Sequence, residues 1–188
     1  MTELLIERDT IDFGDVPEEV NALLQQGVVA YRTNQAKADA LFRQALAAAP
    51  EQLAVYFCLY KIHTYQGSLD EALLIAEQGL REAARQAGWG PDWHKWRAQG
   101  AYPDGPGHCA LYTLKALAFI HLRRNEPAKA EAVLGKLAEL DSAGVIGWHV
   151  VAALAAGVAC TKERGVGANR TCTKGNTPRA DYRIAGIT

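Results

Sequence analysis

The 188-residue chain has few cysteines and almost no net charge, and each shortage excludes a class of function. Its four cysteines stand far apart and form no Cys-x-x-Cys pair, so neither a zinc knuckle nor a dithiol redox site is encoded. A net charge of −1 provides no global field to attract nucleic acid or an anionic membrane. We therefore expect reduced thiols, no nucleic-acid partner and no membrane partner.

Motifs of catalysis, export and membrane insertion are also missing or weak. No Gly-rich phosphate loop follows an expected strand, and no Gly-x-Ser-x-Gly motif is present. Acids stand at the start, where a signal peptide needs a basic region and an apolar core, so we expect a cytoplasmic protein. The uncharged stretch from Ala143 to Cys160 is only weakly hydrophobic, because alanine and glycine fill much of it. It predicts a capping helix, with a membrane tail anchor as the alternative.

What the chain has in quantity is alanine, within a composition typical of one soluble globular domain. Apolar residues make up 49% and charged residues 22%. Alanine dominates the apolar fraction, while aromatic residues are only 8%. Small side chains allow helices to pack closely, so the composition favours an all-α fold.

An internal repeat organises the chain. Similar segments begin at Ala38 and Ala72, which are 34 residues apart, and a third begins at Ala130 after an insertion. Helix start signals precede them, namely Asn34 before the first, Ser68-Leu-Asp-Glu71 as a capping box, and Asn125-Glu-Pro127. The apolar spacing predicts helices over residues 16–32, 35–48, 52–65, 69–87, 107–123, 127–140 and 143–158.

This register resembles the tetratricopeptide repeat family, of the bacterial type. The matching positions are Ala38, Phe42, Ala45, Leu46 and Pro50, then Tyr56, Leu59, Gly67, Ala72, Ala76, Gly79 and Leu80, then Leu114, Leu117, Ala118, Ala130 and Leu134. The resemblance covers about residues 20–158. It implies a right-handed α-α superhelix of about three helical hairpins plus a C-terminal capping helix, with no cofactor.

The same resemblance implies a concave groove, lined by the first helix of each hairpin, that holds a peptide segment of a partner. The inward positions mix cations with aromatic rings, which suits a partner with acidic groups. The asparagine pair of the chaperone-binding members is missing, and a solvated groove without a dedicated ligand is the alternative. The predicted groove residues are Tyr31, Arg32, Phe57, Lys61, Tyr65, Tyr112, Lys115, Phe119 and Arg123.

The insertion at residues 88–107 is the most individual part of the chain. It contains five glycines, three prolines and three of the four tryptophans. Loops of this length are usually functional or disordered, and the tryptophans argue against disorder. We expect a folded loop in which Trp89, Trp93, His94 and Trp96 contact a partner. Alternatively, the tryptophans fill a gap between stacked repeats.

A small enzyme or a metal-binding protein that uses residues 88–109 is the alternative function. It would rest on Cys109 with His108 or His94, whose spacing gives little support. His63 and His121 stand at equivalent repeat positions, so we interpret them as packing residues. The leading hypothesis is a non-catalytic adaptor or scaffold that binds a partner protein. A second copy of the same chain is also a candidate partner.

The N-terminal end of the chain is acidic and the C-terminal end is basic, and we treat each end as a segment separate from the repeat domain. Residues 1–15 form an acidic N-terminal segment, 16–158 the helical repeat domain, and 159–188 a flexible basic tail. Residues 1–19 carry a net charge of −6 and residues 159–188 a net charge of +4. The small overall charge is therefore a cancellation.

Overall fold

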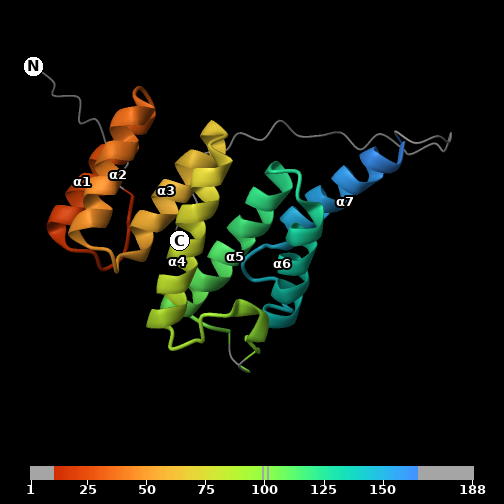
Figure 1. The fold of residues 1–188 in the computed structure, drawn as a ribbon. Coiled ribbons are helices and arrows are strands. Elements are labelled where there is room, and N and C mark those ends of the chain that lie inside the picture. Colours follow the sequence, from red (N-terminus) through yellow and green to blue (C-terminus); the bar gives the residue numbers. More distant parts are fainter. Residues whose placement is uncertain (1–10, 99, 101, 165–188) are drawn as a thin grey trace, which may run out of the picture.

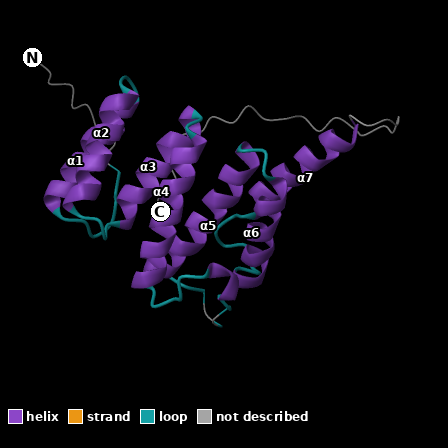
Figure 2. Cartoon of the chain, in the orientation of Figure 1, coloured by secondary structure: helices purple, strands orange, loops and turns teal. Residues whose placement is uncertain are grey.

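The computed structural model describes residues 11–98, 100 and 102–164, which fold into seven α-helices and one short 3₁₀ helix (Figure 1). Among these residues there is no strand (Figure 2). The helices are α1 (Glu18–Tyr31), α2 (Gln35–Ala48), α3 (Leu53–Gln66), α4 (Leu69–Gln86), η1 (Trp93–Lys95), α5 (Gly105–Arg123), α6 (Pro127–Leu140) and α7 (His149–Arg164).

Consecutive helices pack against each other from α1 to α7. The pairs α1 with α2, α3 with α4 and α5 with α6 form hairpins, and α2 contacts α3 while α4 contacts α5 (Figure 1). The first helices of the hairpins also contact each other, α1 with α3 and α3 with α5, and α7 packs on α5 and α6. The predicted all-α fold of three hairpins and a final helix is confirmed. The right-handed superhelix stays a prediction.

The abundant alanine lies where helices cross closely. Ala38, Ala72 and Ala130, the residues that define the repeat, are each 0% exposed. Two glycines allow a still closer approach: a Cβ atom on Gly27 would lie 2.3 Å from Phe42 Cε1, and one on Gly79 would lie 2.8 Å from Cβ of Tyr56. Small side chains at these crossings therefore bury the apolar stripe of each hairpin against its neighbours.

The helix start signals are confirmed at two turns and wrong at the third. Asn34 Oδ1 accepts the Lys37 backbone N–H at 3.0 Å, and Pro127 begins α6 as expected. Ser68 makes no side-chain cap, because the turn has only two residues and its backbone N–H closes the end of α3 on the His63 carbonyl. Glu71, the other half of the expected capping box, pairs with Arg43 of α2 at 2.7 Å.

The last helix begins six residues later than predicted, at His149 in place of Ala143. The carboxylate of Asp141 accepts the backbone N–H groups of Val145 and Ile146, at 2.9 and 3.0 Å, and so holds the segment as a tight loop. Gly144 and Gly147 have positive φ, which a continuing helix does not allow. This loop-and-helix arrangement brings Ile146 and α7 toward α5.

Other helix bounds also differ from the predicted ones. α1 begins at Glu18, after Pro17, and α5 begins at Gly105, two residues earlier than expected. α7 continues to Arg164, so the predicted tail of residues 159–188 begins as helix. The rest of that tail, and residues 1–10 of the predicted acidic segment, lie outside the described residues.

Within the part of the chain that the structure describes, no helix combines the length and the apolar character needed to cross a membrane.

Candidate functional site

A cavity of about 420 Å³ lies between α3, α5 and α7 and contains six of the nine predicted groove residues. We call it the central cavity. Ile146, Val150, Val151 and Leu154 contribute apolar wall from the final loop and helix. The predicted residues that line it are Phe57, Lys61, Tyr65, Tyr112, Lys115 and Phe119.

Helical spacing explains why these six side chains meet. Phe57, Lys61 and Tyr65 recur every four residues along α3, so they form one row on one face. Residues 112, 115 and 119 form a matching row on α5, and the two helices are in contact. The rings of Phe57 and Tyr112 join the rows, with their centroids 5.5 Å apart and tilted by 50°.

Each row places one lysine beside an aromatic ring. Lys61 Nζ lies 4.9 Å from the ring centroid of Phe57, and Lys115 Nζ lies 4.0 Å from that of Tyr112. Lys115 also donates a hydrogen bond to the Ile146 carbonyl at 2.5 Å. No ion pair joins either ammonium group to a carboxylate among the described residues. The cavity therefore contains two cations without a described counter-ion.

Burial lowers the pKa of both lysines below the ordinary value of 10.5. For Lys115, the positive charge of Lys61 lowers the pKa further, while the carboxylate of Asp141 raises it. Asp141 is 2% exposed, and its oxygens already accept two backbone N–H groups of the final loop. The Asp141 carboxylate therefore serves mainly as an acceptor for the loop, and it offsets only part of the positive charge of Lys61 and Lys115.

Apolar side chains surround these cations and remain open to solvent. Val150 is 68% exposed, Leu154 is 45% exposed and Tyr65 is 42% exposed, and all three line the central cavity. Such a combination of exposed apolar surface and a few polar groups is typical of a binding site. It suits a ligand with an apolar body and an anionic group.

The other three predicted groove residues do not line the central cavity. Tyr31 lines a separate small cavity of about 30 Å³ beside α1. Arg32 and Arg123 are exposed and line neither cavity. Arg32 directly follows α1 and Arg123 ends α5, so both lie at helix termini, beyond the rows that face each other.

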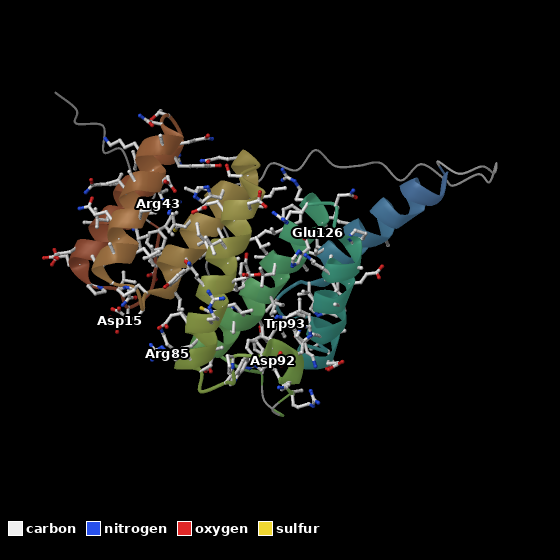
Figure 3. All side chains as sticks on the ribbon, in the orientation of Figure 1. Asp15, Arg43, Arg85, Asp92, Trp93 and Glu126 are labelled. Atoms are coloured by element: carbon white, nitrogen blue, oxygen red, sulfur yellow. The ribbon has the colours of Figure 1, made fainter. Side chains whose placement is uncertain are left out.

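The tryptophan loop packs on the helices and does not line the central cavity. Trp96 is 7% exposed, and its Nε1 donates to the Gly90 carbonyl at 2.7 Å. The Trp89 ring meets it edge to face with centroids 4.7 Å apart. Trp93 is half-buried and stacks on the exposed His94. Figure 3 shows Trp93 near the ends of α5 and α6 that lie away from Glu126.

The loop residues predicted to contact a partner differ in how much of each side chain faces solvent. The burial of Trp96 leaves almost no ring surface for a partner, which favours the gap-filling alternative for this residue. Its backbone carbonyl also accepts a hydrogen bond from Lys136 of α6 at 3.4 Å. His94 and part of Trp93 face solvent, so a contact there stays a prediction.

Two of the three residues of the enzyme alternative line one hollow and the third does not. His108 and Cys109 line a wide hollow of about 840 Å³ at the N-terminal end of α5, but His94 is not among its lining residues. Burial raises the pKa of the Cys109 thiol, which disfavours the thiolate that a nucleophile needs. The described residues contain no group of three His, Cys, Asp or Glu side chains placed to hold a metal ion.

The chain matches no family model, curated protein or solved structure with which it was compared. The geometry of the central cavity therefore carries the functional argument.

Sequence reasoning missed the polar contacts that join one hairpin to the next. His63 is buried as predicted, but its Nε2 also lies 2.9 Å from an Asp39 oxygen of α2. Two arginines from other hairpins pair with acids of α4: Arg43 of α2 with Glu71, and Arg124, just after α5, with Asp70. The equal spacing of the two histidines was the only signal in the sequence, and it did not identify their partners.

Proposed function

We propose that the protein is a non-catalytic interaction module that binds a peptide segment of a partner in the central cavity. The segment inserts apolar side chains and directs at least one carboxylate toward Lys61 and Lys115. One observation carries this proposal: two partly buried ammonium groups share an apolar cavity without a described carboxylate partner. The resemblance of the repeats to tetratricopeptide proteins, which hold peptides, supports it.

The energetic argument concerns the cost of leaving these cations unpaired. Burial of a charge without a counter-ion is unfavourable, as the lowered pKa values of both lysines indicate. Leucine or methionine would fill the same space at a lower cost in free energy. Residues that break such a local rule are typical of functional sites. A ligand carboxylate would form charge-assisted hydrogen bonds there and offset the cost.

The size of the cavity agrees with a ligand of moderate size. Its volume of about 420 Å³ lies within the range of ordinary small-ligand pockets. It accommodates a few side chains and not a folded domain. The exposed side chains of Val150 and Leu154 extend the apolar surface along α7, where the rest of a peptide can lie.

Selection from a random-peptide display library tests the proposal without knowledge of the partner. The wild-type chain should enrich peptides in which Asp or Glu adjoins large apolar residues. Binding of an enriched synthetic peptide is then measured by titration calorimetry. Replacement of either lysine by methionine should weaken binding by about tenfold, the value of one charge-assisted hydrogen bond.

Lys129→Met is the matched control, because Lys129 is an exposed lysine on α6 and lies outside the cavity. It should leave the affinity unchanged. Lys61→Glu and Lys115→Glu should abolish the binding of acidic peptides. Enrichment of no peptide, or equal affinity of the wild type and the Lys61→Met/Lys115→Met variant, would sink the proposal.

A further inference from the structure

The chain reaches α1 along a path that begins beside the central cavity. Ile11 and Phe13 line the small cavity of about 30 Å³ next to α1. Phe57, Lys61 and Tyr65 line this small cavity and the central cavity as well. The two hollows thus share one wall, and the residues just before Ile11 start at that wall.

Ile11 is fixed in place by hydrogen bonds to α1. Its N–H donates to Gln25 Oε1 at 3.3 Å, and its carbonyl accepts from Gln25 Nε2 at 2.6 Å. The same Gln25 amide donates to Asn21 Oδ1 at 3.2 Å, which orients it. The point from which residues 1–10 depart is therefore set by the folded domain, although those residues lie outside its described part.

The composition of residues 3–9 complements the central cavity. The segment reads Glu-Leu-Leu-Ile-Glu-Arg-Asp, an apolar centre between acids. These are the two kinds of group that the cavity geometry selects. A stretch of seven extended residues spans roughly 23 Å, and Lys61 lines the same small cavity as Ile11. The segment is long enough to reach both lysines from Ile11.

We propose that residues 3–9 occupy the central cavity of their own chain when no partner is bound. This inference rests on the proposed function, because it makes the segment a tethered competitor for the same site. Leu4, Leu5 and Ile6 supply the apolar groups, and Glu3, Glu7 and Asp9 supply carboxylates for the two lysines. A partner must displace the segment, so the segment determines how tightly a partner must bind in order to occupy the cavity.

Tethering makes even a weak contact effective. A segment joined to its site by a short connection has an effective concentration of roughly millimolar. A competitor with a dissociation constant of that order would occupy the cavity in about half of the molecules. Stronger binding by the segment would raise the apparent dissociation constant of the partner in proportion.

Zero-length cross-linking with a carbodiimide tests the occupant directly. The reagent joins a carboxylate to a lysine only when the two are in contact, and mass spectrometry locates the bond. We expect bonds from Glu3, Glu7 or Asp9 to Lys61 or Lys115. The neighbouring pair Lys136 and Glu139, whose charged atoms lie 2.6 Å apart, supplies the internal control.

A mixture of unlabelled and ¹⁵N-labelled full-length chain separates bonds within one chain from bonds between chains. Bonds within one chain support the proposal. Bonds found only between labelled and unlabelled chains would overturn it in favour of a second copy as the occupant. Absence of any bond from residues 3–9 to the two lysines, while Lys136 is joined to Glu139, would also overturn it.

Competition is tested with the variant E3K/E7K/D9K and the enriched acidic peptide. Loss of the tethered competitor should raise peptide affinity by about twofold or more. The control variant E18K/E19K changes two exposed acids of α1 that line neither hollow, and should leave affinity unchanged. Equal affinity of E3K/E7K/D9K and the wild type would overturn the proposal. If no peptide binds any of these chains, the proposed function fails, while the cross-linking result still decides the occupant.

Discussion

At the scale of single residues, the partial burial of two charged lysines, Lys61 and Lys115, costs the folded protein free energy. Both ammonium groups lie among aromatic and aliphatic side chains, and burial lowers the pKa of both. Lys115 donates a hydrogen bond to the Ile146 carbonyl, whereas the ammonium group of Lys61 lies over the ring of Phe57. Lys61 is therefore the residue at which stability and function conflict most clearly.

We predict that Lys61→Met stabilises the protein while it weakens peptide binding. The folded state binds fewer protons than the unfolded state between the lowered pKa and 10.5, so the free energy of unfolding rises with pH in that window. At pH 7 the substitution should add about 0.5–1 kcal/mol to the free energy of unfolding, measured by urea denaturation. A loss of stability would show that the cavity does not penalise the charge.

Trp96 is expected to contribute to stability and not to binding. Trp96→Ala removes a buried ring and the hydrogen bond to Gly90, and should cost about 3–5 kcal/mol of unfolding free energy. His94→Ala in the same loop removes an exposed ring and should change stability by less than about 0.5 kcal/mol. Thermal melts of both variants check this, and similar losses for the two would contradict the gap-filling role of Trp96.

At the scale of elements, the loop of residues 141–148 decides the shape of the site. It ends α6, delays the start of α7 and presents the Ile146 carbonyl to Lys115. Trp148 Nε1 donates to the Asp141 carbonyl at 2.9 Å, which ties the far end of the loop to its beginning. The cavity wall formed by α7 thus depends on one buried carboxylate.

Asp141→Ala should destabilise the protein and impair the cavity together. It leaves two backbone N–H groups without acceptors and should cost about 2–4 kcal/mol, measured by urea denaturation. Asp141→Asn keeps one acceptor oxygen and should cost about half as much. Peptide affinity should fall in the same order under conditions in which all chains are folded. If Asp141→Ala binds peptide as tightly as the wild type, the loop does not shape the binding site.

At the scale of the whole molecule, the fold is a linear stack in which each hairpin contacts its neighbours. Apolar packing joins consecutive helices, and ion pairs bridge the junctions on the surface. Arg124 is central to one junction, because it pairs with Asp70 of α4 and with Glu126 at the start of α6. Figure 3 places Arg43 and Glu126 on different hairpins of the stack.

Glu126 should make this junction sensitive to acid. Hydrogen bonds from His121, Arg124 and Lys129 lower the pKa of its carboxyl to about 2, with the His121 contact as the largest cause. A carboxyl with a lowered pKa stabilises the fold above its unfolded pKa, near 4.5, and that contribution is lost as the pH falls toward 2. The stability difference between the wild type and Glu126→Gln should therefore shrink as the pH falls from 4.5 to 2. Thermal melts across this range measure it, and a difference independent of pH would contradict the assignment.

The sequence by itself determined the helical hairpins and the two rows of groove side chains on α3 and α5. Both follow from local rules, since the spacing of apolar residues sets a helix and its faces before any tertiary contact forms. The family resemblance and the binding role that it implies stay predictions.

Only the tertiary structure decided which predicted residues meet. Six of the predicted groove residues line one cavity together with α7. Arg32 and Arg123 lie at helix ends outside that cavity, and Trp96 is buried. The start of α7 could not be read from periodicity, because the side chain of Asp141 competes for the backbone N–H groups that a helix would use. The bridges between hairpins join residues 28 and 54 positions apart. Such pairings depend on how the hairpins stack, which local spacing does not encode.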